Sequence, residues 1–148
     1  MVIHAITDLF RDIVGIFAKL IPLAANYNAR VVLVNRRDYP GAAPHAKEAR
    51  AVLDAAAAEV VTDTAAARDR LLQYMEYNGR DVYDLLVGFV AENDIPKAST
   101  EANSGGIVVG GWSFASGWMI SLLAFADSFP VGSVDLGAYL RRVILYGM

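Results

Sequence analysis

The sequence of 148 residues contains no cysteine. Disulfide bonds, thiol catalysis and cysteine-ligated metals are therefore excluded, although cysteine usage gives no indication of the cellular compartment. Histidine is scarce, with only His4 and His45, and the sequence shows neither metal-ligand spacing nor a Gly-rich phosphate loop. We therefore expect no metal and no cofactor.

Basic charge is also in short supply. The 13 Lys and Arg residues are outnumbered by 16 Asp and Glu residues, and they form no cluster. A net charge of −3 without a basic patch argues against nucleic acid as a partner. The first residues lack a basic leader followed by an apolar segment, so no secretory signal is predicted and a cytoplasmic location is favoured.

The long stretch from Ala102 to Ala126 contains no charged residue. Its length is sufficient to cross a bilayer, so a membrane span is one interpretation. However, Gly110, Gly111 and Gly117 interrupt the stretch, and its first part is β-branched. This pattern favours a buried strand, a sharp turn and a buried helix, and we expect no membrane span.

Ser113 stands at the predicted corner between strand and helix. Bulky side chains two positions away on either side would collide at such a turn, and Gly111 and Ala115 occupy those positions. The pattern Gly-x-Ser-x-Ala is a variant of the nucleophile elbow Gly-x-Ser-x-Gly. A serine that caps a helix is the alternative interpretation.

The rest of the chain alternates between apolar strands and helical patterns. This alternation predicts an α/β fold with a parallel sheet and helices on both faces. We expect one domain over residues 1–148, with a helical insertion at about residues 46–78 and a break at Gly79 before the helix 81–93. A further helix is predicted over residues 11–25, with Pro22 near its end. The predicted sheet order is Arg30–Asn35, Met1–Ala5, Ile107–Gly110, Val143–Tyr146.

Three segments together carry a family resemblance. Val32–Gly41 contains a strand that ends in an Arg-x-x-Pro-Gly turn, Gly110–Gly117 contains the elbow, and His4-Ala5 takes the place of a His-Gly pair. In this order they resemble the central part of the α/β-hydrolase fold, most closely in uncharacterised fungal α/β-hydrolases. The resemblance covers nearly the whole chain and implies a partial α/β-hydrolase core.

The resemblance implies a serine hydrolase of the esterase, lipase or peptidase type, with a small ester or amide as its substrate. Ser113 is then the nucleophile, and the oxyanion donors are the Phe114 N–H and the loop at Ala5 and Ile6. The candidate pocket residues are Trp112, His4 and Tyr39, whereas Trp118 is expected in the core.

The sequence departs from the family pattern after Ser113. No histidine follows it, and the only later carboxylates are Asp127 and Asp135. His45, which follows the Pro-Gly turn, is the remaining candidate base. The chain is therefore expected to be weak or inactive as a hydrolase, and a non-catalytic binding or interaction protein on the same scaffold is the alternative.

Two predicted outer strands are apolar throughout, at Val31–Val34 and Val143–Leu145. An uncovered apolar strand at a sheet edge invites pairing with another chain. We therefore expect a homo-oligomer or a partner chain that covers the sheet edges.

Overall fold

The computed structural model describes residues 2–7, 17, 19–39, 42–130, 132 and 134–147, and for residues 2–7 it describes the backbone alone. The elements of this part of the chain are β1 (Val2–Thr7), α2 (Leu20–Ala24), β2 (Arg30–Asn35), α3 (Lys47–Glu59), α4 (Thr64–Glu92), β3 (Ile107–Trp112), α5 (Ala115–Phe125) and β4 (Leu140–Tyr146). Short 3₁₀ turns follow α2 and α5 and precede β4, at Ala25–Tyr27, Ala126–Ser128 and Leu136–Ala138. The fold is thus a mixture of helices and parallel strands.

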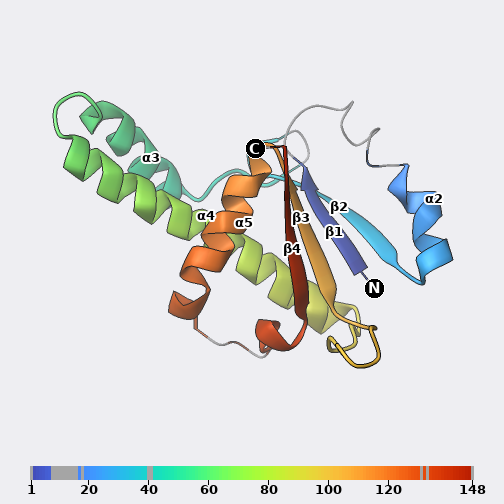
Figure 1. Cartoon of the computed structure of the whole chain (residues 1–148). Helices are drawn as coiled ribbons and strands as arrows, with labels where there is room; N and C mark the ends of the chain where they lie inside the picture. The colour runs from blue at the N-terminus through green and yellow to red at the C-terminus, as the bar shows by residue number, and fades with distance from the viewer. Residues whose placement is uncertain are drawn as a thin grey trace.

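The four strands form one sheet in the order β2-β1-β3-β4, and each neighbouring pair is parallel. The predicted order is therefore confirmed. The crossover from β1 to β2 runs across the sheet in the opposite direction to those from β2 to β3 and from β3 to β4, and right-handed crossovers in opposite directions place their helices on opposite faces. Accordingly, α2 lies on one side of the sheet, and α4 and α5 lie on the other (Figure 1).

The main core lies between β3 and the helices α4 and α5. Ile107 and Val109 are fully buried against this side, together with Leu86, Met119 and Leu122. Because side chains alternate along a strand, Val108 and Trp112 point to the opposite face. There the Trp112 ring meets the Phe17 ring edge-on, with centroids 5.8 Å apart. Both faces of β3 are therefore covered, as expected for a parallel sheet.

The predicted break at Gly79 is wrong, because α4 continues through it from Thr64 to Glu92. A Cβ atom at Gly79 would lie 2.7 Å from the backbone oxygen of Ser121. The glycine therefore permits a close crossing of α4 and α5 and does not end a helix. The predicted insertion at about residues 46–78 is in fact a hairpin of α3 and the first half of α4, which extends beyond the sheet (Figure 1).

The boundaries of other predicted strands and helices also differ from those in the structure. The first strand ends at Thr7 rather than at Ala5. Part of the predicted helix 11–25 lies outside the described residues, and α2 contains Pro22 in its first turn, where the missing N–H costs no helical hydrogen bond. Ala102–Ala126 is not one helix, since it contains both β3 and α5. Of the helices that the structure describes, none has the length and apolar character needed to span a membrane.

Candidate active site at the carboxyl edge of the sheet

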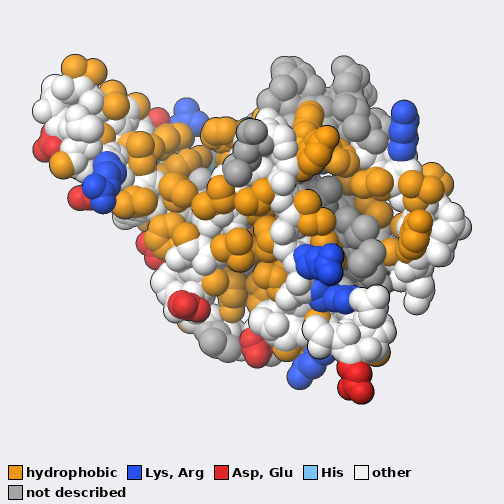
Figure 2. Space-filling model, in the orientation of Figure 1, with side chains coloured by type: hydrophobic (Ala, Val, Ile, Leu, Met, Phe, Trp, Pro, Cys, Tyr) orange, Lys and Arg blue, Asp and Glu red, His pale blue; other side chains and the backbone are white. Residues whose placement is uncertain are grey.

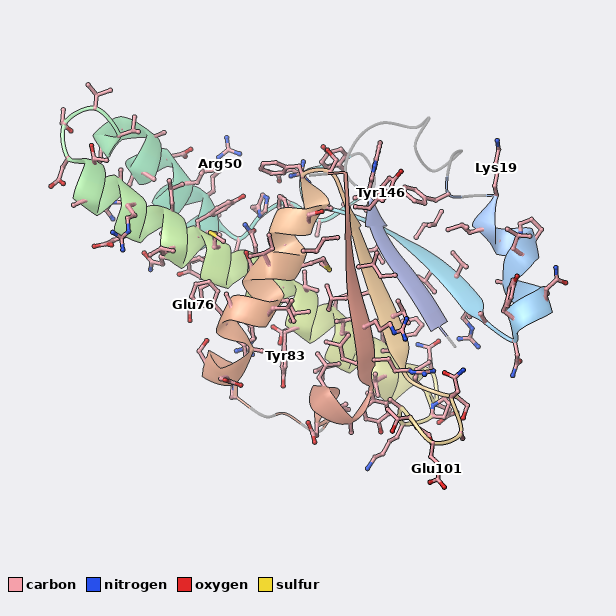
Figure 3. The ribbon with its side chains drawn as sticks, viewed as in Figure 1. Lys19, Arg50, Glu76, Tyr83, Glu101 and Tyr146 are labelled. Carbon is pink, nitrogen blue, oxygen red and sulfur yellow. The ribbon has the colours of Figure 1, made fainter. Side chains whose placement is uncertain are left out.

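The candidate site lies where β3 ends and α5 begins. Ser113 is the first residue after β3, and α5 starts at Ala115 with Phe114 as its N-cap. The Ser113 N–H donates to the Tyr146 carbonyl at 2.8 Å, and the Ser116 N–H donates to the Ser113 carbonyl at 3.0 Å. Tyr146 ends β4 at the same edge of the sheet, while Glu101 lies in the loop at the opposite edge (Figure 3). Hydrogen bonds therefore fix the Ser113 backbone on both sides.

Ser113 has a φ of +54°, in the left-handed region. Among the described residues, four other non-glycine residues have positive φ, and all four are Asn or Asp, which tolerate this region through local hydrogen bonds: Asn28, Asp38, Asp94 and Asn103. A serine has less of this tolerance, and such a conformation costs about 1–3 kcal/mol. The backbone at Ser113 is therefore held in place by the surrounding fold.

The space around the turn explains the glycine two residues before Ser113. A Cβ atom at Gly111 would lie 2.7 Å from Met119 Cγ and 2.8 Å from the Ala115 carbonyl oxygen. The predicted need for a small residue at position 111 is thus confirmed. Gly117 is different, because a Cβ atom there would meet nothing within 4 Å.

The two serines near the turn differ in exposure. Ser116 is fully buried, and its Oγ donates to the Gly111 carbonyl at 3.0 Å, so it braces the turn from inside. Ser113 is exposed, and it precedes the N-cap residue Phe114; no side chain caps α5. The alternative that Ser113 serves as the helix cap is therefore wrong. The first N–H groups of a helix have no acceptor within it, so those of Phe114 and Ala115 are suited to bind an anion near Ser113.

Arg36, the residue after β2, reaches the elbow through a group of aromatic rings. The Arg36 guanidinium carbon lies 4.5 Å from the ring centroid of Trp118, 4.7 Å from that of Tyr39 and 5.1 Å from that of Phe114. Arg36 also donates to the Tyr39 hydroxyl at 2.6 Å. Cation–π contacts of this kind stabilise partly buried guanidinium groups. They connect the end of β2 to the residue that follows Ser113.

The neighbouring Arg37 anchors the same loop to α4. Its Nε and Nη2 donate to the two carboxylate oxygens of Asp81 at 2.5 and 2.8 Å, and its Nη1 donates to the Pro44 carbonyl at 2.9 Å. The hydrogen bond to Asp81 raises the pKa of Arg37 above its ordinary value, with partial burial acting in the opposite direction. A bidentate pair of this geometry fixes the loop at the carboxyl edge.

His45, the candidate base, lies on this loop but is engaged elsewhere. Its ring Nε2 is 3.4 Å from the Tyr74 hydroxyl, and its backbone N–H donates to Asp38 Oδ1 at 2.9 Å. The buried Nδ1 has no hydrogen-bond partner among the described residues. His45 and Ser113 are both described, and no hydrogen bond joins them. The role of His45 as a base stays a prediction.

The prediction that Ala5 and Ile6 lie in an oxyanion loop is wrong. Both residues lie inside β1, where Ala5 pairs with Leu33 and Gly110, and Ile6 with Val34 and Gly111. Because a central strand uses its N–H groups in the ladder on both sides, these two are not available to a ligand. The positions that follow Thr7 lie outside the described residues.

The three predicted pocket residues do not gather in one place. Tyr39 contacts Arg36 beside the elbow, whereas Trp112 points to the opposite face, toward Phe17. His4 lies within β1, and its side chain is outside the described part of the chain. Trp118 is buried, as predicted. Phe114, in contrast, is 66% exposed.

The two carboxylates that follow Ser113 in the sequence lie at the other edge of the sheet. Asp127 follows α5 and Asp135 precedes β4, so both lie toward the amino edge of the sheet. Asp135 accepts a hydrogen bond from the Gly137 N–H at 3.0 Å and thereby caps a turn. Neither carboxylate is placed to act beside Ser113.

A search of the described residues finds no group of three or more His, Asp or Glu side chains arranged to hold a metal ion. One open hollow of about 260 Å³ lies between α4 and the turn after α5, and none of its lining residues belongs to the elbow: Gln73, Glu76, Tyr77, Arg80, Ser128 and Phe129.

Sequence reasoning did not anticipate the Arg36 cluster. One signal was present, because Phe114 and Trp118 are four residues apart and share a helix face. Their rings are 5.2 Å apart in an edge-on arrangement. That spacing did not indicate that Arg36 would pack against the two rings. Comparison of the chain with protein families, curated proteins and solved structures finds no match.

Proposed function

We propose that this protein is an α/β-hydrolase-like serine hydrolase in which Ser113 attacks an ester or amide carbonyl. The observation that carries the proposal is the exposed serine with a φ of +54° between a parallel strand and a helix. Backbone strain of this kind is concentrated at functional sites, and the strand–turn–helix context is the one that the nucleophile elbow requires. The parallel strand order around β3 also agrees with a partial α/β-hydrolase core.

In the proposed reaction, the Ser113 Oγ forms a bond to the carbonyl carbon, and the hydroxyl proton passes to water. The Phe114 N–H, at the start of α5, stabilises the oxyanion. The bond from the acyl carbon to the ester oxygen or amide nitrogen then breaks, and the alcohol or amine leaves with a proton taken from water. Water attacks the acyl-serine, which releases the acid and restores the hydroxyl.

The proposed reaction is slow because, among the described residues, no side chain is placed to act as a base on Ser113. His45 Nε2 faces the Tyr74 hydroxyl at 3.4 Å. A serine hydroxyl without a base is a weak nucleophile at neutral pH. Hydrolases that lose members of their triad retain roughly 10³–10⁴-fold catalysis over water from the oxyanion hole and from binding.

The test is covalent labelling with a fluorophosphonate, followed by intact mass and peptide mapping. We expect slow labelling of wild type at Ser113 alone and none in Ser113→Ala. Ser104→Ala is the matched control, since Ser104 is an exposed serine outside the elbow and its loss leaves the rate unchanged. Labelling at several serines with equal rates, or none after prolonged incubation, contradicts the proposal.

His45→Ala separates the two roles of this histidine. We expect an unchanged labelling rate, because the ring is engaged with Tyr74. A large loss of rate, with the fold intact by circular dichroism, identifies His45 as the base instead.

The second candidate is a non-catalytic binding protein on the same scaffold. The Tyr74–His45 contact favours it, because the one histidine on the carboxyl-edge loop is held by a structural partner. Absence of labelling together with an intact fold supports this candidate.

A further inference from the structure

The open edge of β4 is the starting point. The strand order places β4 at one end of the sheet, and no other described strand pairs with its outer side. The Tyr146 carbonyl accepts from the Ser113 N–H, so the main-chain groups of Tyr146 point toward β3. Because these groups alternate in direction along a strand, Val143 and Leu145 point theirs toward the open edge. Such a row of available donors and acceptors is a template for another strand.

The side chains of this edge are apolar. Ile144 is 50% exposed, Leu145 38% and Tyr146 69%. Natural sheets protect open edges with charge, proline or bulges. Here Arg142 is the one exposed charge on the strand, because Arg141 turns back to donate to Asn103 Oδ1 at 2.7 Å. The second half of β4 therefore has no such protection.

Leu145 points to the face of the sheet that α5 covers, where α5 adds exposed apolar side chains, whereas Ile144 and Tyr146 point to the face of Trp112. Ile120 and Leu123 are exposed three residues apart on the outer side of α5, whereas Phe114 packs against Arg36, which follows β2. No residue of Ala115–Phe125 is charged. A helix that is apolar on all sides is normally buried on all sides. Figure 2 shows hydrophobic side chains gathered over α5, with basic side chains beside them near the middle of the view.

The exposed apolar area is about half of what a standard interface buries. Five exposed side chains contribute most of it, namely Ile120, Leu123, Ile144, Leu145 and Tyr146. A fully exposed aromatic side chain presents about 150–250 Å² and an aliphatic one less, so these partly exposed side chains together offer on the order of 400 Å² per copy. A standard interface buries about 800 Å² per partner, and the strand backbone supplies part of the remainder.

We propose that β4 pairs with β4 of a second copy, antiparallel, about a two-fold axis at Ile144. In this register Val143 lies opposite Leu145 of the other copy, and both have main-chain groups that point to the open edge. The pairing joins the two sheets into one, and the axis stands perpendicular to it. Both α5 helices consequently lie on the same face of the joined sheet.

This register is complementary in charge. Arg142 lies opposite Tyr146 of the other copy, on the same face of the sheet, so the single exposed cation meets an exposed aromatic ring twice per dimer. The two Arg142 side chains are kept apart by about four residues along the strand direction, roughly 13 Å. An axis at Arg142 would instead place these two charges opposite each other, which is unfavourable.

A cysteine scan tests the axis directly, because the chain has no cysteine of its own. Residues on a two-fold axis in a non-hydrogen-bonded pair have Cα atoms about 4.5 Å apart, within the range for a disulfide. With a mild oxidant such as diamide, we expect Ile144→Cys to form a covalent dimer. Arg142→Cys alone and Tyr146→Cys alone should remain uncross-linked, whereas a mixture of the two should form a mixed disulfide.

Light scattering on the cysteine-free protein supplies the second measurement. We expect a dimer mass at micromolar concentration and a monomer mass for Ile144→Lys, since two ammonium groups then meet on the axis. Val61→Lys is the matched control: Val61 is 90% exposed at the tip of the α3–α4 hairpin, and its change leaves the dimer intact. A wild-type monomer at high micromolar concentration overturns the proposal. A dimer that survives Ile144→Lys, or that cross-links at another position of β4, overturns the proposed axis.

Discussion

The helices α4 and α5 pack on the same face of the sheet, but their outer sides differ. On α4 the buried residues Val82, Leu86 and Val90 face the core, and its outer side includes the ion pair of Arg80 with Asp84. The outer side of α5 carries Ile120 and Leu123 and no charge.

On α4, Leu71, Leu72 and Leu85 are also partly exposed, but the helix carries charged residues as well, whereas α5 carries none. An amphipathic helix such as α4 satisfies its apolar side in the core and its polar side in water. The apolar outer side of α5 gains nothing from water and becomes favourable only when it is covered. Substitutions on the inner and outer sides of the two helices can break or sharpen this contrast.

The largest effect is expected inside α4. Leu86 is fully buried in the core, so Leu86→Ala should lower the free energy of unfolding by about 2–5 kcal/mol through lost burial and a residual cavity. The measurement is urea denaturation followed by circular dichroism. Leu85→Ala is the control on the same turn: Leu85 is 40% exposed, and its loss should cost much less. Equal costs at both positions would contradict the inner and outer assignment.

The crossing of the two helices gives the next effect. In Gly79→Ala the new Cβ would lie 2.7 Å from a backbone oxygen of α5, which cannot move as a side chain does. We expect a loss of about 1–3 kcal/mol from overpacking. Gly88→Ala in the same helix meets nothing within 4 Å and should instead gain up to about 1 kcal/mol from helix propensity. Chemical denaturation of both variants compares them, and a loss in Gly88→Ala would refute the contrast.

The outer ion pair of α4 should have a small effect. Arg80 Nε lies 2.8 Å from Asp84 Oδ1, with both side chains largely exposed. Exposed pairs of this spacing contribute about 0.3–0.5 kcal/mol, and salt screens them. A double-mutant cycle with Arg80→Gln and Asp84→Asn measures the coupling. We expect it to vanish in 1 M NaCl, and a coupling that persists there would indicate a less exposed pair.

The smallest effect on the folded monomer is expected on the outer side of α5. Leu123 is 55% exposed, so Leu123→Gln should change the unfolding free energy by less than about 0.5 kcal/mol at a concentration where the protein is monomeric. At high concentration it should weaken self-association, which light scattering detects. A large loss of monomer stability would mean that this side of α5 is covered within one copy.

Local patterns in the sequence predicted the sheet well. Continuous apolar runs such as Val31–Val34 and Ile107–Val109 are typical of strands buried in a parallel sheet. The alternation of strands and helices led to the predicted strand order, which the structure has. The small residue at Gly111 was predicted for the reason that the structure shows. These predictions depended on neighbours in the chain or on general rules of topology.

The errors involved contacts between distant residues. Gly79 was interpreted as a break because glycine is a poor helix former, but its role depends on Ser121 in another helix. The partners of Arg36 and His45 likewise come from other elements, in the rings of Phe114 and Tyr74. No periodicity in the sequence indicates which side chains will meet across a sheet edge. The geometry at Ser113 was predictable as a turn, whereas its catalytic partners were not.

The position of β1 in the middle of the sheet has a consequence for how the chain folds. Val2 pairs with Arg30 on one side and with Ile107 on the other, so the second pairing closes a loop of roughly a hundred residues. Closing a long loop costs entropy before the contact returns any energy, and proteins rich in such pairings fold slowly. The segment from Ile107 to Tyr146 holds β3, α5 and β4 together through closer contacts. We therefore expect this segment to gain structure first during refolding, with the docking of β1 as the slow step.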